Sequence, residues 1–162
     1  MSAAPRPSYR DLLRRPHWWL AFGGGVGLAP RAPGTAGTLV AVPLWWWAAA
    51  WPPWAYGLLL VGVIGAGPWL CGRTAAELGC HDHPGIVWDE IAGFLLAMTA
   101  VAPSWTALLA GFASFRFFDA VKPWPIRWLD RRLGGGWGIM ADDLAAGLAT
   151  AAVLHLAASL WG

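Results

Sequence analysis

Charged side chains are concentrated between positions 115 and 143 of an otherwise apolar chain. The sequence has 11 Lys and Arg and 9 Asp and Glu residues in 162, and nine of these charges lie in that stretch. Carboxylate oxygens are ligands for hard divalent cations, and guanidinium and ammonium groups bind phosphate. The stretch therefore predicts a site for a divalent cation and a phosphate group. Its candidate residues are Asp119, Asp142, Asp143, Arg116, Lys122 and Arg127.

A second acidic pair, Asp89 and Glu90, begins another apolar segment. Carboxylates at a helix N-terminus are stabilised by the helix dipole, and this alone would explain them. Adjacent like charges beside lipid repel each other unless a cation lies between them. We therefore expect at least one of the pair to bind metal. Gly93, one turn further on, would let another backbone or a ligand approach closely.

Glycine and proline dominate residues 23–38, ahead of an apolar helix expected from about residue 37. A glycine-rich turn that enters a helix can direct backbone N–H groups at an anion. Thr35 and Thr38 would add hydroxyl donors to a bound phosphate, or one of them caps the helix. Both interpretations stay open. The Gly-Lys-Ser/Thr ending of a P-loop is absent.

Spacing within the charged stretch suggests contacts between its members. Arg116 and Asp119 share a helix face, so they form either an intrahelical ion pair or part of the phosphate site. Lys122 follows at the helix end, and glycines at 134–138 are expected to form a flexible turn before Asp142 and Asp143.

The histidines of the loop at 81–83 lack nearby zinc-ligand partners and are expected to lie on the surface.

The composition indicates one domain, residues 1–162, embedded in a membrane. Hydrophobic residues make up 57% of the chain and charged residues 12%, the mean hydropathy is +0.49, and there are 14 Trp. Soluble domains carry roughly 25% charged residues. The net charge of +2 is too small, and the basic residues too dispersed, to indicate nucleic acid. Nothing at the N-terminus resembles a cleaved signal peptide.

Apolar segments predict an all-α fold, a polytopic helical bundle of about five segments. Crossing the hydrocarbon core takes about 20 helical residues. Only residues 54–72 and 142–161 reach this length. The other three are short enough to be half-spanning or re-entrant. They are residues 37–51, 88–102 and 104–119.

The distribution of charge predicts the orientation. All charged residues lie in three polar segments, residues 1–36, 73–90 and 116–143. If each apolar segment crosses once, these three share one side, and the positive-inside rule makes that side cytoplasmic. The N-terminal segment, residues 1–20, and the charged site would then be cytoplasmic. Tryptophans suited to the interface surround the uncharged hairpin at 51–54, namely Trp45, Trp46, Trp47, Trp51 and Trp54.

Several motifs in order resemble one known family, the bacterial phosphatidylglycerophosphatase A enzymes. The resemblance covers nearly the whole chain, from the Pro-Gly-Thr turn at 33–35 to the last helix. Its most specific parts are IVWDE at 86–90, FRFFD at 115–119, KP at 122–123, PI at 125–126 and GIMADD at 138–143. The resemblance implies a Mg²⁺-dependent phosphatase of the bacterial inner membrane. Its substrate would be phosphatidylglycerophosphate, a phospholipid held in the bilayer, and its product phosphatidylglycerol.

The resemblance also implies the roles of individual residues. The family's basic positions fall on Arg116 and Lys122, as binders of the substrate phosphate. The chain lacks the signatures of three other phosphatase classes. These are Cys-x5-Arg of cysteine phosphatases, Asp-x-Asp of the haloacid dehalogenase type and Ser-Gly-His of histidine-based lipid phosphatases. Water activated by metal is the favoured nucleophile, and an attacking Asp is the alternative. The family's acidic positions, catalytic and metal-binding, fall on Asp89, Glu90, Asp119, Asp142 and Asp143.

Two other functions fit parts of the pattern. A small ion-coupled transporter would use membrane carboxylates, but it would place them near the bilayer midplane rather than at segment ends. Another metal-dependent lipid headgroup enzyme, such as a transferase using an activated alcohol, would also cluster Asp residues. The Asp-Gly-x2-Ala-Arg signature of such transferases is absent. Hydrolysis of a lipid phosphomonoester with one or two Mg²⁺ ions is the leading hypothesis.

Overall fold

The computed structural model describes residues 7–81 and 83–161, and every regular element in these ranges is helical, without strands. The all-α prediction is confirmed. Residues 1–6, Asp82 and Gly162 of the predicted domain lie outside the described residues. The elements are α1 (Tyr9–Arg14), α2 (Pro16–Ala21), the 3₁₀ helix η1 (Gly23–Leu28), α3 (Pro33–Ala48), α4 (Pro53–Leu78), α5 (Trp88–Ala97), α6 (Trp105–Val121), α7 (Ile126–Arg132) and α8 (Gly135–Trp161).

Proline, serine and glycine set several helix ends. Pro33 and Pro53 occupy the first turns of α3 and α4, where no backbone donor is lost. Ser104 caps α6 by accepting a hydrogen bond from the Ala107 N–H at 3.1 Å. Gly79 ends α4 in the left-handed conformation that glycine readily adopts. The hairpin predicted at 51–54 is present, because α3 and α4 are joined by residues 49–52, whereas α5 and α6 are joined by the longer stretch 98–104.

Two helices, α4 and α8, are long and apolar enough to cross a membrane, judged by length and composition. At about 1.5 Å per residue, the 10 residues of α5 cover only about 15 Å, half of a hydrocarbon core. Helices α3 and α6 have 16 and 17 residues. Among the described residues, the helices that could cross a membrane are thus the two longest, α4 and α8.

The start of α8 differs from the prediction. Residues 134–138 are not a flexible turn before the acidic pair, because α8 begins at Gly135 and Asp142 lies two turns inside it. Glycine has a low intrinsic helix propensity, but tertiary packing overrides it here. A Cβ at Gly136 would overlap the backbone carbonyl of Pro68 in α4. Gly136 therefore allows a close contact between α8 and α4.

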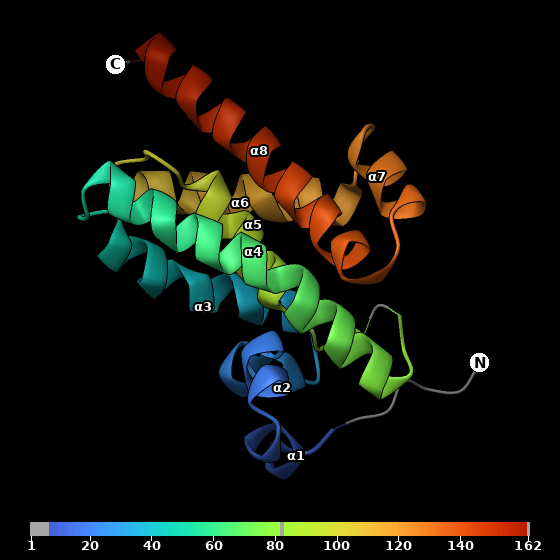
Figure 1. Ribbon diagram of the computed structural model, residues 1–162. Helices are drawn as coiled ribbons and strands as arrows, with labels where there is room; N and C mark the ends of the chain where they lie inside the picture. Colours follow the sequence, from blue (N-terminus) through green and yellow to red (C-terminus); the bar gives the residue numbers. More distant parts are fainter. Residues whose placement is uncertain (1–6, 82, 162) are drawn as a thin grey trace.

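Helix α5 lies at the centre of the bundle and packs against α3, α4, α6 and α8 (Figure 1). Its side chains Phe94 and Leu95 are fully buried, as are Trp45 of α3 and Phe115 of α6. The hydroxyl of Tyr56 in α4 donates to the Leu95 carbonyl at 2.6 Å. A short helix with neighbours on all sides gives its N-terminal residues a fixed position.

The outer surface of the two long helices is apolar. Leu58, Val61 and Trp69 of α4 are exposed, and so are Leu148, Leu156 and Leu160 of α8. The C-terminal half of α8 projects away from the other helices (Figure 1). Extensive exposed apolar surface is typical of proteins that associate with membranes.

Candidate active site

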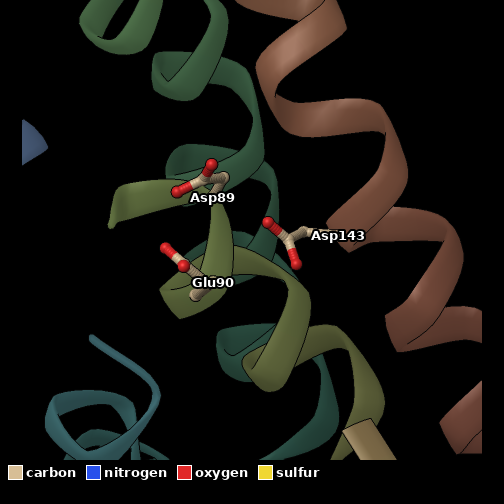
Figure 2. Close-up of side chains that lie close together, drawn as sticks. All are labelled: Asp89, Glu90 and Asp143. Atoms are coloured by element: carbon tan, nitrogen blue, oxygen red, sulfur yellow. The ribbon is translucent and has the colours of Figure 1, made fainter. Parts of the chain in front are cut away.

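The five predicted acidic residues gather in one place. Figure 2 shows Asp143 of α8 pointing toward the first turn of α5, which carries Asp89 and Glu90. One oxygen of each of the three residues lies within 4.8 Å of the others. Asp119, Asp142 and Asp143 form a second group within the same distance. Asp143 belongs to both groups. Residues from three helices, far apart in the sequence, therefore build one acidic cluster.

Burial makes this cluster costly to hold without a cation. Asp89, Asp142 and Asp143 are at most 7% exposed. One oxygen of each, and one of Glu90, has no hydrogen-bond partner among the described residues. Buried carboxylates that lack partners are destabilising unless they are neutralised or coordinate a cation. Hard oxygen donors with free lone pairs in this number fit Mg²⁺.

Close helix packing at Gly93 brings the two parts of the cluster together. A Cβ at this position would lie 2.6 Å from the backbone carbonyl oxygen of Asp143 and 2.9 Å from the ring of Phe115. Only a hydrogen atom fits there, so α5 and α8 can approach closely. The predicted close approach at Gly93 is therefore made by another backbone.

Gly34 of α3 borders the cluster in the same way. A Cβ at Gly34 would overlap a carboxylate oxygen of Glu90. The glycine-rich segment thus contributes space beside the acidic cluster as well as a turn.

Two cationic side chains flank the carboxylates. Arg116 Nη1 lies 2.6 Å from Asp119 Oδ2, so the intrahelical ion pair, one of the two alternatives for these residues, is present. The Lys122 ammonium contacts Asp142 and lies 3.0 Å from Asp130 Oδ1. Burial alone would lower the Lys122 pKa, but its bonds to Asp142 and Asp130 outweigh that and raise the pKa above its usual value. Lys122 is therefore a permanent cation at physiological pH.

Of the two predicted threonines, Thr38 contacts a residue of the site, Arg116. Thr38 is fully buried and donates to the Gly34 carbonyl at 3.0 Å. Its hydroxyl oxygen also accepts a hydrogen bond of 3.5 Å from Arg116. Neither Thr35 nor Thr38 lines the adjacent cavity. Their contact with a phosphate stays a prediction, while the structure shows Thr38 positioning the guanidinium.

A polar cavity of about 440 Å³ joins these groups. All five acidic residues line it, together with Arg116 and Lys122. Residues 32–34 form part of its wall. The cavity therefore combines cation-binding and anion-binding side chains at one opening, as attack on a phosphate ester requires.

Two polar side chains that line the cavity, those of Asp130 and His81, were not predicted as site residues. Asp130 lies on α7 and holds the Lys122 ammonium. Both histidines of the loop were expected on the surface, but only His81 is exposed, and His83 is buried at 6% exposure. His81 also lines the cavity, and its Nε2 accepts a hydrogen bond from the Gly135 N–H at 3.2 Å. Asp130 was visible among the nine clustered charges. No local pattern linked His81 to the start of α8.

Comparison with known proteins gives matches over almost the entire chain. The sequence profile described as Phosphatidylglycerophosphatase A matches residues 19–158. The chain is 41% identical to the Escherichia coli protein named phosphatidylglycerophosphatase A, covering 96% of this chain and 94% of that protein. It is 38% identical to the Haemophilus influenzae protein of the same name, covering 96% of each.

A more distant relative carries a different name. A Bacteroides thetaiotaomicron protein provisionally named phosphatidylinositol-3-phosphatase is 34% identical, over 88% of this chain and 90% of that protein. No solved structure matches the chain significantly. The matched residues 19–158 include the charged motifs and all of α3 to α7. The chain therefore belongs to the phosphatidylglycerophosphatase A family.

Proposed function

We propose that the protein hydrolyses phosphatidylglycerophosphate to phosphatidylglycerol and phosphate. One water is consumed, and the bond between the terminal phosphorus and the glycerol oxygen breaks. The observation that carries this proposal is the gathering of five carboxylates and two cations around one cavity, in a member of this family. The names of the relatives from Escherichia coli and Haemophilus influenzae support the choice of substrate.

Mg²⁺ is the cofactor we propose for the acidic cluster. Bound there, it would neutralise phosphoryl charge and lower the pKa of a water molecule. The residues that would hold one or two ions are Asp89, Glu90, Asp119, Asp142 and Asp143. Their unpartnered oxygens support this assignment.

The protein's own side chains would bind and orient the phosphate. Arg116 offers a planar guanidinium for bidentate contact, and Asp119 and Thr38 fix its position. Lys122 offers a point charge at the other side of the cavity. We propose water as the nucleophile, with a carboxylate of the cluster accepting its proton. Attack by an Asp is the alternative.

We further propose that the chain is a multi-pass protein of the bacterial inner membrane. Helices α4 and α8 would span, and the shorter α3, α5 and α6 would each carry the chain from one face to the other across a locally thinned bilayer. The concentration of Lys and Arg in three polar segments supports a cytoplasmic N-terminus and a cytoplasmic acidic cavity. The substrate's acyl chains would then stay in the bilayer while its headgroup enters the cavity.

Phosphate release by the purified protein in detergent micelles tests this function. We expect release from phosphatidylglycerophosphate with Mg²⁺, its loss on addition of EDTA, and a loss of about 100-fold or more in Glu90→Gln. Asp11→Asn, which changes a carboxylate of α1 outside the cavity, is the matched control and should stay active. No release by the folded wild-type protein with Mg²⁺ present would refute the proposal.

A further inference from the structure

A second cavity lies beside the acidic one and is lined by cations and indoles. It has a volume of about 420 Å³ and is formed by the turn after α6 together with α7. We call it the arginine groove and define it by Lys122, Trp124, Arg127, Trp128, Arg131 and Arg132. Arg127, a candidate for the phosphate site in the sequence, lines this groove and not the acidic cavity, and the same holds for Arg131 and Arg132.

The three arginines of the groove carry uncompensated charge. Among the described residues, none of them has a carboxylate within ion-pair distance. Asp130, the one carboxylate on α7, is engaged by Lys122. Arg127 donates to the Val121 carbonyl at 3.2 Å, and Arg132 stacks over Trp128 with 5.2 Å to the ring centroid. These contacts orient the guanidinium groups without neutralising them.

The groove is suited to the membrane interface. Trp124 is 83% exposed and Trp128 49% exposed. Tryptophan with arginine at a surface is typical of the headgroup level of a bilayer, where the indole meets acyl carbons and the guanidinium meets phosphate. The occupant with complementary charge is therefore an anionic phospholipid headgroup.

Lys122 joins the groove to the acidic cavity, because it lines both. Its ammonium contacts Asp142 on one side and Asp130 on the other. A ligand that places one phosphate in each cavity would thus pass beside a single lysine. Phosphatidylglycerophosphate has this form, a terminal phosphomonoester and a phosphodiester separated by one glycerol.

We propose that the arginine groove binds the phosphodiester of the substrate while its terminal phosphate occupies the acidic cavity. This inference rests on the proposed function. The groove would then set headgroup selectivity, since a lipid with a single phosphate, such as phosphatidic acid, cannot fill both cavities. The phosphatidylinositol 3-phosphate implied by the name of the Bacteroides relative also combines a phosphodiester with a separate phosphomonoester.

Neutralising the groove is the direct test. In Arg127→Gln/Arg131→Gln/Arg132→Gln, we expect the KM for phosphatidylglycerophosphate to rise about tenfold or more, with a smaller change in kcat, because binding to an unreacting group is lost. The matched control is Arg10→Gln/Arg14→Gln/Arg31→Gln, which removes equal charge from exposed positions outside both cavities. Its KM should remain within about twofold of wild type. Arg131→Gln alone should give a smaller rise if the triple variant folds poorly.

A binding measurement separates this inference from the proposed function. Native mass spectrometry of detergent-released protein, titrated with phosphatidylglycerol or phosphatidylcholine, needs no turnover. Wild type and the control should retain phosphatidylglycerol preferentially, and the groove variant should lose that preference. Equal retention in all three proteins, or the same rise in KM in both triple variants, would overturn the inference. A wild type that retains phosphatidylglycerol but releases no phosphate would refute the proposed function alone.

Discussion

Asp143 is the residue on which both acidic groups depend, since its carboxylate belongs to each of them. We predict that Asp143→Asn lowers kcat/KM for phosphatidylglycerophosphate by about 100-fold or more, because both groups lose a charged ligand. Removing one of several crowded negative charges should leave the unfolding temperature in EDTA unchanged or raised. Phosphate release and thermal unfolding in detergent measure these effects. Activity within threefold of wild type would contradict the assignment.

Arg116 contacts two groups that hold it in place, Asp119 and Thr38. Arg116→Lys keeps the charge but loses the planar fork, so we expect kcat/KM to fall by about 10- to 100-fold. Arg73→Lys is the matched control, because Arg73 forms an exposed i,i+4 ion pair with Glu77 away from the cavity. Equal activity of the two variants would show that only the charge at position 116 matters.

For single residues, the sequence predicted which carboxylates would come together, but not which contacts the neighbouring polar side chains would make. Crowded charge in an apolar chain identified the acidic residues, since such groups need one another or a cation. The position of Thr38 depended on where α3 begins. A start at Pro33, four residues earlier than expected, lets the Thr38 hydroxyl bond back to Gly34 within the helix.

The contact between α5 and α8 positions the acidic cluster, and Gly93 permits it. We predict that Gly93→Ala destabilises the protein by about 1–3 kcal/mol through overpacking. It should also reduce phosphate release by moving Asp89 and Glu90 away from Asp143. Gly62→Ala in α4 is the control, because a Cβ there meets nothing within 4 Å. That change should be neutral or stabilising. Similar unfolding temperatures for the two variants would contradict the packing argument.

Hydrophobic runs predicted the existence of the five main helices better than their bounds. Helix α8 extends into a glycine-rich stretch because α4 packs against it, which no local signal records. Helix α5 stops at Ala97, although apolar residues continue to 102. The short helices α1, α2 and α7 lie in the segments that contain the charged residues, where no helical repeat of apolar residues predicted them.

The arrangement of the whole chain in a membrane is open to chemical labelling. In a Cys71→Ala/Cys80→Ser background, we predict that Ala102→Cys, between α5 and α6, reacts with an impermeant maleimide added to intact spheroplasts. Arg131→Cys, beside the acidic cavity, should react only after the membrane is disrupted. The basis is the segregation of Lys and Arg into three segments. The reverse pattern would place the catalytic face outside.

The two halves of α8 face different surroundings, and this has a consequence for evolution. From Gly138 to Thr150 the helix buries Ile139, Met140 and Ala146 beside the acidic residues, whereas Val153, Leu156 and Leu160 are exposed. Residues in contact with lipid need only be apolar, so one can replace another at little cost to fitness. Residues packed among other helices must also match in shape. Over long divergence, exposed positions such as Val153, Leu156 and Leu160 should therefore drift freely among apolar residues, while Ile139, Met140 and Ala146 change slowly.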